Sequence, residues 1–263
     1  MRSDDIILDI KDLSKTYSRN VSLFKKQKVN ALHHVSLSIK RGLTFALVGE
    51  SGSGKSTLAR LIMKLEPQTR GSILIDCQSI KKDIRHIGSK EYYGRVQMIF
   101  QDPYASLNPC KKIWQIISAP LLGNNAYKKA ELYSIAEKYC QWVGLGRDYL
   151  EAYPRALSGG QRQRVGIARA LVLKPDLLIL DEALSALDLS IQAQIINLLI
   201  DLQTRLGLTY LFISHDMNMV EYFADHVAVM QTGEIVECAD VLNIFSRPAH
   251  QYTCQLVAKQ FCF

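Results

Sequence analysis

The sequence predicts an α/β fold in which a mostly parallel sheet is flanked by helices and interrupted by a helical insertion. Short runs of β-branched and apolar residues alternate with helical patterns along most of the 263 residues, which is typical of parallel sheets with crossover helices. One apolar run leads directly into a glycine-rich turn and then a helical pattern. A middle stretch has helical patterns and turn residues, but it has no strand pattern.

The apolar run at residues 44–48, Thr-Phe-Ala-Leu-Val, predicts a buried strand. After the glycine-rich turn, apolar residues recur at helical spacing, and these are Leu58, Leu61, Ile62 and Leu65. Further strands are predicted at 96–100, 177–180, 209–213 and 227–230. A long helix ending near Gly207 is predicted from one apolar face, formed by Ile191, Ile195, Leu198, Leu202 and Leu206.

The segment from about Asp102 to Arg164 predicts a helical insertion between strands of the sheet. Turn residues such as Pro103, Pro120 and Pro154 punctuate its helical patterns. No linker rich in Gly or Ser separates the segment, so we expect it to pack against its host. The basic residues 25–28, Lys-Lys-Gln-Lys, lie between two early strands and predict a solvated loop.

Composition excludes several classes of protein. Hydrophobic residues make up 48% and charged residues 22%, so disordered and collagen-like chains are excluded. No apolar run approaches the roughly 20 residues that span a bilayer. The first residues do not resemble a signal peptide, and we expect the chain to work in the cytoplasm. The net charge of +7 permits anionic partners, but no basic stripe with interleaved aromatic residues indicates nucleic acid.

Cysteine spacing predicts thiols rather than disulfides or a zinc site. The six cysteines have no CxxC pair and no histidine at metal-ligand spacing. We therefore expect reduced and mostly buried thiols.

The strongest functional pattern is a GxxxxGK[ST] motif between a predicted strand and a predicted helix. Its residues are Gly49, Glu50, Ser51, Gly52, Ser53, Gly54, Lys55, Ser56 and Thr57. The glycines let backbone N–H groups turn toward phosphate oxygens, and the helix N-terminus favours negative charge. Lys55 would contact the β- and γ-phosphates of a nucleotide, and Ser56 would bind Mg²⁺. An ordinary glycine-rich turn would not need this strand and helix.

Two acids end the apolar run at 177–180. Neighbouring side chains on a strand point to opposite sides, so Asp181 and Glu182 would face different groups. We assign Asp181 to Mg²⁺, through water, and Glu182 to polarising the attacking water. The alternative is that both acids merely cap the following segment.

The GxxxxGK[ST] motif, or P-loop, occurs in several classes of nucleotide-binding protein. A second glycine-containing motif, Leu157-Ser-Gly-Gly-Gln161, distinguishes among these classes. Ser158 and Gln161 form a capping box that opens a helix. Gly159 and Gly160 in the first turn cost about 1 kcal/mol each relative to Ala. Bare N–H groups at that helix end are useful if a phosphate must approach closely.

With these motifs together, nearly the whole chain resembles the ATP-binding subunits of ABC transporters. The resemblance implies that Ser158, Gly159, Gly160 and Gln161 contact ATP held by the opposite subunit of a dimer. It also implies that Tyr17 stacks on adenine and that Gln101 senses Mg²⁺. Asp188 would end a segment exchanged across the dimer, and His215 would contact the γ-phosphate.

The resemblance also implies an architecture. It is a P-loop NTPase core of mostly parallel sheet flanked by helices, with an antiparallel β part near the N-terminus. The whole of 1–263 would be a single ABC ATPase domain. Residues 1–100 and 165–237 would form the core, 101–164 the inserted helical subdomain, and 238–263 a C-terminal tail.

Within the superfamily, three segments resemble the dipeptide, oligopeptide and nickel importer group. They are residues 100–109, residues 192–199 and the element Arg247-Pro-Ala-His250-Gln-Tyr252-Thr253. Such importers imply two membrane permease subunits, a second ATPase subunit and an extracytoplasmic solute-binding protein. Their ATPase subunits are peripheral at the cytoplasmic face of the bacterial inner membrane, with ATP and Mg²⁺ as cofactors.

Two departures from the group bear on the cargo. Ala183 stands where most of the family has Pro, and the chain ends soon after the His-x-Tyr-Thr element. Both features favour a nickel or metal-chelate importer, without excluding a dipeptide, oligopeptide or antimicrobial-peptide importer. A soluble ABC-type ATPase acting on nucleic acid or ribosomes is the alternative from another class, and we expect no nucleic-acid partner. A small-molecule kinase would leave the second glycine motif unexplained.

Overall fold

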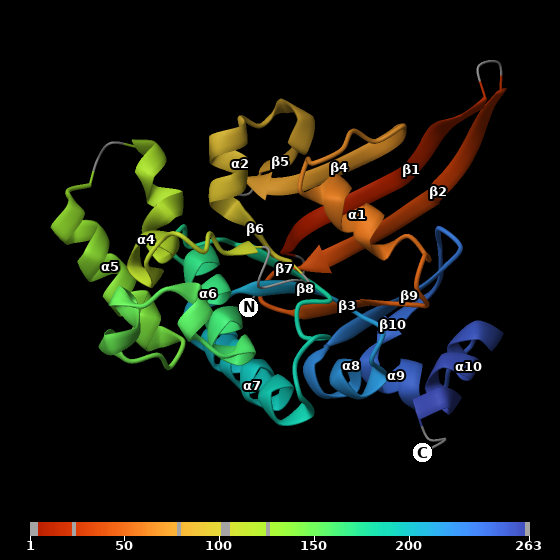
Figure 1. Cartoon of the computed structure of the whole chain (residues 1–263). Coiled ribbons are helices and arrows are strands. Elements are labelled where there is room, and N and C mark those ends of the chain that lie inside the picture. Colours follow the sequence, from red (N-terminus) through yellow and green to blue (C-terminus); the bar gives the residue numbers. More distant parts are fainter. Residues whose placement is uncertain (1–4, 23–24, 78–79, 101–105, 125–126, 261–263) are drawn as a thin grey trace. The chain divides into compact units, whose positions relative to one another are not determined.

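The computed structural model describes residues 5–22, 25–77, 80–100, 106–124 and 127–260. The chain forms two compact units (Figure 1). The first unit combines Met1–Tyr93 with Leu208–Phe263, and the second is Gly94–Gly207. The α/β class predicted from the sequence is confirmed.

An antiparallel sheet in the first unit has the strand order β2-β1-β4-β5. Its strands are β1 (Ile6–Ser22), β2 (Lys25–Lys40), β4 (Arg70–Cys77) and β5 (Ile80–Asp83). The first two strands form the long hairpin drawn in red and orange in Figure 1. The prediction of a solvated loop at residues 25–28 is wrong, because Lys25, Lys26, Gln27 and Lys28 pair with β1 as the start of β2.

The other strands of the first unit are mostly parallel and carry the motif loop. They are β3 (Thr44–Val48), β8 (Thr209–Ser214), β9 (His226–Gln231) and β10 (Glu234–Asp240), in the order β10-β9-β3-β8. Strand β3 is parallel to both β8 and β9, whereas β10 is antiparallel to β9. Every residue of β3 and β8 is buried, as expected for strands covered on both faces.

The described helices of the first unit include one that follows the glycine-rich turn directly. They are α1 (Lys55–Ile62), α2 (Ser89–Arg95, which runs into the second unit), α8 (Met217–Phe223), α9 (Val241–Ser246) and α10 (Gln251–Gln260). Leu58, Leu61 and Ile62 are buried as predicted. Leu65 is not on this face: the helix ends at Ile62, Lys64 adopts a left-handed backbone, and Leu65 is 53% exposed.

The second unit pairs two parallel strands and packs several helices. The strands are β6 (Val96–Ile99) and β7 (Leu177–Asp181). The α-helices are α4 (Ile113–Ser118), α5 (Lys129–Trp142), α6 (Gly159–Leu171) and α7 (Leu189–Leu206). Helices α4 and α5 lie within the predicted insertion. Helix α7 has Gly207 as its C-cap, as predicted. Ile195 and Leu202 of the predicted apolar face are buried, together with Ile196 and Leu199, whereas Leu206 is exposed.

The expectation of mostly buried cysteines is wrong for the described thiols. Cys110, Cys238 and Cys254 are exposed, and Cys140 is buried. Burial raises the pKa of the Cys140 thiol to about 11, so this thiol stays protonated at neutral pH. Among the described residues, no helix is long and apolar enough to cross a membrane.

The core beneath the motif loop gives a stability prediction. Leu58 on α1 is fully buried, whereas Leu242 on α9 is 78% exposed. We expect Leu58→Ala to lower the free energy of unfolding by about 2–5 kcal/mol, because it leaves a cavity as well as losing apolar burial. Leu242→Ala removes the same atoms from the surface and should change it by less than about 0.5 kcal/mol. Urea unfolding of both variants checks this, and equal losses would contradict it.

Candidate functional site

The phosphate-binding motif leaves β3 as a tight loop that only glycine can form. Gly49, Gly52 and Gly54 all have positive φ, at 150°, 82° and 111°. A Cβ on Gly49 would lie 2.1 Å from the carbonyl oxygen of Met230, and one on Gly54 would lie 2.8 Å from that of Ala31. The N–H of Gly233 also donates to the carbonyl of Ser53 at 2.9 Å. The loop backbone is therefore packed against the turn between β9 and β10.

Lys55 is already held inside this loop. Its side chain is buried, and its Nζ donates to the carbonyl oxygens of Gly49 and Glu50, both at 2.8 Å, and to Ser53 Oγ at 3.3 Å. These three oxygens surround the ammonium group of Lys55. The ammonium group is thus oriented toward the interior of the loop rather than toward bulk water.

The N-terminus of α1 supplies the donors that a phosphate needs. The helix begins at Lys55, has Gly54 as its N-cap residue, and has no side-chain hydrogen bond at that cap. The first N–H groups of a helix have no partner within it, and the helix dipole adds positive potential there. Ser56 and Thr57 in this first turn add hydroxyl groups. The donor set fits a nucleotide polyphosphate.

Tyr17, the residue predicted to stack on adenine, lies beside the motif. It is half-buried on β1, its hydroxyl forms a hydrogen bond with the side chain of Thr57, and it donates to Glu66 Oε2 at 2.5 Å. The Nζ of Lys15 lies 4.8 Å from its ring centroid. Burial and the bond to Glu66 raise the pKa of the Tyr17 hydroxyl, so it remains a donor.

Strand register places His215 at the same edge of the sheet as the motif. Val48, the last residue of β3, pairs with Ser214, the last residue of β8. Gly49 and His215 therefore follow paired residues of two parallel strands. His215 is exposed, and the next residue, Asp216, caps α8 by accepting from the N–H groups of Asn218 and Met219.

The two acids of the second unit do not alternate along a strand as predicted. Strand β7 ends at Asp181, and Glu182 has a left-handed backbone with φ of 47°. The Glu182 carbonyl accepts from both the N–H and the Oγ of Ser185, which makes a turn. The backbone of Glu182 therefore belongs to a turn and does not continue strand β7. Both acids are half-buried.

Gln101 lies outside the described residues.

The capping box predicted at the start of α6 is confirmed. Ser158 Oγ accepts from the N–H of Gln161 at 3.3 Å, and Gln161 Oε1 accepts from the N–H of Ser158 at 2.9 Å. The glycines have a packing role as well as bare N–H groups. A Cβ on Gly160 would lie 2.6 Å from Ile191 Cγ2, and one on Gly159 would lie 3.2 Å from Leu187 Cδ2.

Asp188 is the N-cap residue of α7 and is exposed. Its carbonyl accepts from the N–H groups of Ile191 and Gln192, while Gln192 Nε2 donates to the carbonyl of Leu184. The segment from Glu182 to Asp188 is therefore a series of turns fixed to the start of α7. The start of α6 packs on this same segment through its glycines.

The described site residues thus form two sets. The motif loop, Tyr17 and His215 come together in the first unit. The acids, the capping-box helix and Asp188 come together in the second. Sequence reasoning missed Glu66 and Met230, because nothing in their sequence neighbourhood indicates the distant residues that they contact.

The first unit also contains a cavity of about 360 Å³. Its lining combines apolar and charged side chains: Leu61, Lys64, Leu65, Glu66, Pro67, Gln68, Ile84 and Arg85. None of the nine motif residues lines it, so we do not assign phosphate binding to it.

Known proteins that resemble this chain include ATP-binding proteins of ABC transporters. A family model described as "ABC transporter" matches residues 32–185. The dipeptide transport ATP-binding protein DppF of Escherichia coli is 44% identical over 96% of this chain and 75% of its own length. A probable peptide ABC transporter ATP-binding protein, y4tS of Sinorhizobium fredii, is 44% identical over 97% of this chain and 72% of its own. The dimeric ATP-binding cassette MJ0796, solved with ADP and phosphate, has a TM-score of 0.76 and 29% identity, covering 89% and 99% of the two chains.

The buried lysine gives a direct test of the loop. We expect Lys55→Ala to weaken ATP binding at least tenfold, because it removes the positive charge that the loop holds in place. Equilibrium titration with ATP measures this. Lys90→Ala removes a charge from an exposed position on α2 and serves as the control. Equal affinities of the Lys55 variant and the wild type would contradict the assignment.

Proposed function

The chain belongs to the ABC transporter family of ATP-binding proteins, and from that premise we propose that it powers a peptide importer. As a member, it binds and hydrolyses ATP, and such subunits work as dimers with membrane permeases. The observation that supports peptides as the cargo is the 44% identity, over nearly the whole chain, to two relatives named for peptide transport.

The nucleotide would lie on the motif loop, with the following roles for each residue. Backbone N–H groups from Gly49 to Thr57 and the Lys55 ammonium hold the phosphates, and Tyr17 stacks on adenine. Mg²⁺ would be bound by Ser56, Gln101 and Asp181, whose hydroxyl, amide and carboxylate oxygens are the donors that this hard cation prefers. When bound, the ion neutralises charge on the phosphates.

Glu182 would orient and polarise the attacking water, with His215 and Gln101 completing the γ-phosphate surroundings. The turn that Ser185 makes around the Glu182 carbonyl supports this role, because it fixes the backbone that carries the carboxylate. Val48 pairs with Ser214, so Gly49 and His215 follow paired residues at the same edge of the sheet. This supports a position of the histidine beside the phosphates.

A second ATPase subunit would complete each site. The exposed Asp188 and the capped α6 N-terminus, Ser158 to Gln161, belong to one set of contacts in the second unit. We propose that this surface closes over ATP on the motif loop of the partner subunit. The dimer of the 29% identical MJ0796 cassette supports this arrangement.

Removing the Glu182 carboxylate should separate binding from turnover. We expect Glu182→Gln to keep ATP binding within about threefold of wild type while lowering kcat by 10²-fold or more, because an amide does not act as a base. Phosphate release and ATP titration on the same preparation measure the two effects. Glu234→Gln, at an exposed site on β10, is the matched control. Wild-type turnover in the Glu182 variant would remove it from this role.

Peptides are now better supported as cargo than nickel. The names of the relatives reported above refer to peptides and dipeptides, and none of them refers to nickel. The preference for nickel rested on Ala183 and the short tail. In the structure Ala183 is buried and its methyl side chain carries no reactive group, so it does not indicate the solute. Nickel transport stays a prediction without further support.

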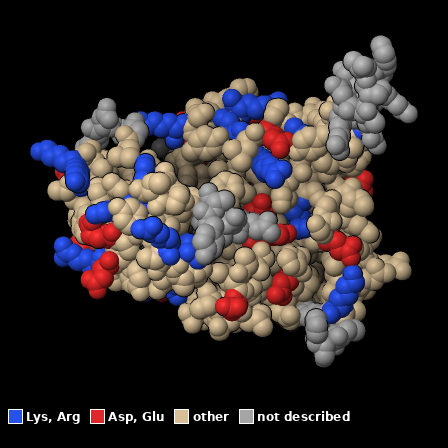
Figure 2. Space-filling model, in the orientation of Figure 1, with Lys and Arg blue, Asp and Glu red and all other residues tan. Residues whose placement is uncertain are grey.

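We propose the remaining partners by the same resemblance. Two membrane permease subunits and an extracytoplasmic solute-binding protein would complete the importer, with this chain at the cytoplasmic face of the membrane. The division into a core of 1–100 and 165–237, a helical subdomain of 101–164 and a tail of 238–263 also stays a proposal. On the face in Figure 2 acidic and basic side chains are interspersed. This distribution argues against a nucleic-acid partner, which would need a basic patch.

Uptake by cells tests the cargo. We expect cells that lack this chain to lose uptake of a radiolabelled dipeptide and to keep uptake of radiolabelled nickel. A plasmid copy of the wild-type gene should restore the loss, and a Glu182→Gln copy should not. Loss of nickel uptake with dipeptide uptake intact would contradict the peptide assignment and support nickel as the transported solute.

A further inference from the structure

The element Arg247 to Thr253 distinguishes the importer group, yet the ATPase chemistry above gives it no role. In the structure it leads into α10 and belongs to the first unit, together with the motif loop. Two of its residues are deeply buried: Tyr252 is 7% exposed and Thr253 is fully buried. Its position in the fold indicates what it does.

The start of α10 is fixed to β10 by one carboxylate. Glu237 accepts from the N–H of Ala249 at 2.8 Å and from the N–H of His250 at 2.9 Å. Burial alone would raise the pKa of Glu237, but these and further hydrogen bonds hold it below its usual value. The N–H of Tyr252 donates to Nδ1 of His250 at 3.2 Å. The position of Tyr252 is therefore set by its own neighbours and by β10.

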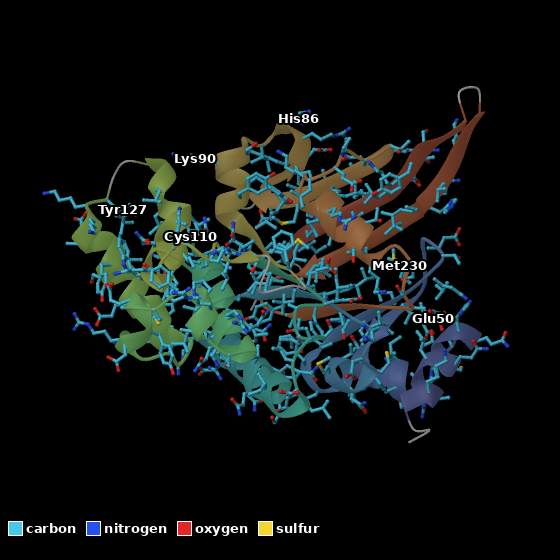
Figure 3. All side chains as sticks on the ribbon, in the orientation of Figure 1. Glu50, His86, Lys90, Cys110, Tyr127 and Met230 are labelled. Carbon is cyan, nitrogen blue, oxygen red and sulfur yellow. The ribbon has the colours of Figure 1, made fainter. Side chains whose placement is uncertain are left out.

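From this position Tyr252 reaches the phosphate-binding loop. Its hydroxyl oxygen accepts from the backbone N–H of Glu50 at 2.9 Å, across 202 residues of sequence. Further along α10, Lys259 Nζ lies 2.8 Å from Glu50 Oε1, although both of these side chains are largely exposed. Figure 3 shows Glu50 at the side of the sheet where α10 lies.

The N–H of Glu50 and the carbonyl of Gly49 belong to one peptide group. Lys55 Nζ donates to the carbonyl side of this group, and Tyr252 accepts on its N–H side. A peptide group is planar, so fixing its N–H also fixes the direction of its carbonyl oxygen. The tyrosine hydroxyl thereby controls the oxygen that orients the phosphate-binding lysine.

We propose that Tyr252 is a positioning residue for nucleotide binding, acting through the Gly49–Glu50 peptide group on Lys55. Gly49 alone would leave that group free to rotate, because glycine tolerates many backbone angles. The hydroxyl selects the one orientation in which the loop is ready for phosphate. This inference rests on the proposed binding of nucleotide at the motif loop.

Tyr252→Phe tests the proposal with the loss of a single oxygen atom. We expect the Kd for MgADP to rise about threefold to tenfold, because the binding-competent loop becomes a minor fraction of the population. Isothermal titration with MgADP avoids hydrolysis. In the assembled transporter the KM for ATP should rise by a similar factor while kcat stays near wild type, since Tyr252 touches no reacting atom.

Two control variants separate this effect from general changes. Tyr127→Phe removes a hydroxyl from an exposed site in the second unit and should leave the Kd unchanged. Lys259→Ala breaks only the exposed ion pair with Glu50 and should change the Kd by less than about twofold. A role limited to packing would lower the Tm of the Tyr252 variant and leave its Kd for MgADP unchanged, which would overturn the proposal.

A double-mutant cycle tests the route through the lysine. In a Lys55→Ala background, Tyr252→Phe should weaken MgADP binding by less than about twofold, because the group that it positions is absent. Fully additive effects would show that Tyr252 does not act through Lys55. If wild-type protein itself binds no MgADP, the proposed function fails. If wild type binds and Tyr252→Phe binds equally well, only the positioning role fails.

Discussion

The site depends on one close contact between backbones. The carbonyl oxygen of Met230 occupies the space where a side chain on Gly49 would be, only 2.1 Å from an ideal Cβ. The phosphate-binding loop can leave β3 in this direction only because residue 49 is glycine. The pairing of β3 with β9 in parallel register, Val48 opposite Val229, sets where that carbonyl stands. The register between β3 and β9 therefore limits the shape that the phosphate-binding loop can take.

Charge placement follows from this constraint. With the loop fixed, the carbonyl oxygens of Gly49 and Glu50 accept hydrogen bonds from the Lys55 ammonium, and α1 begins at this residue, so the helix dipole adds positive potential there. A buried cation is costly unless it is hydrogen-bonded, so these oxygens stabilise the lysine before nucleotide arrives. Phosphate then meets groups that are already oriented, which lowers the entropy that binding must overcome.

Local patterns predicted the elements well, and contacts between distant segments explain the rest. The buried strands, the glycine motif and the Ser158 capping box are encoded by residues close in sequence. Residues 25–28 looked like a loop because four polar residues carry no strand signal, yet pairing with β1 makes them a strand. The bond from Glu50 to Tyr252 joins residues 202 positions apart, so no local pattern specifies it.

The central claim is that this chain turns over ATP as part of a membrane transporter. Phosphate release from MgATP, measured on the chain assembled with its permease subunits in lipid vesicles, tests that claim most directly. We predict steady phosphate release that rises when peptide-loaded binding protein is enclosed in the vesicles and that disappears when this chain is left out. No phosphate release from the complete assembly, with every subunit present and folded, would contradict it.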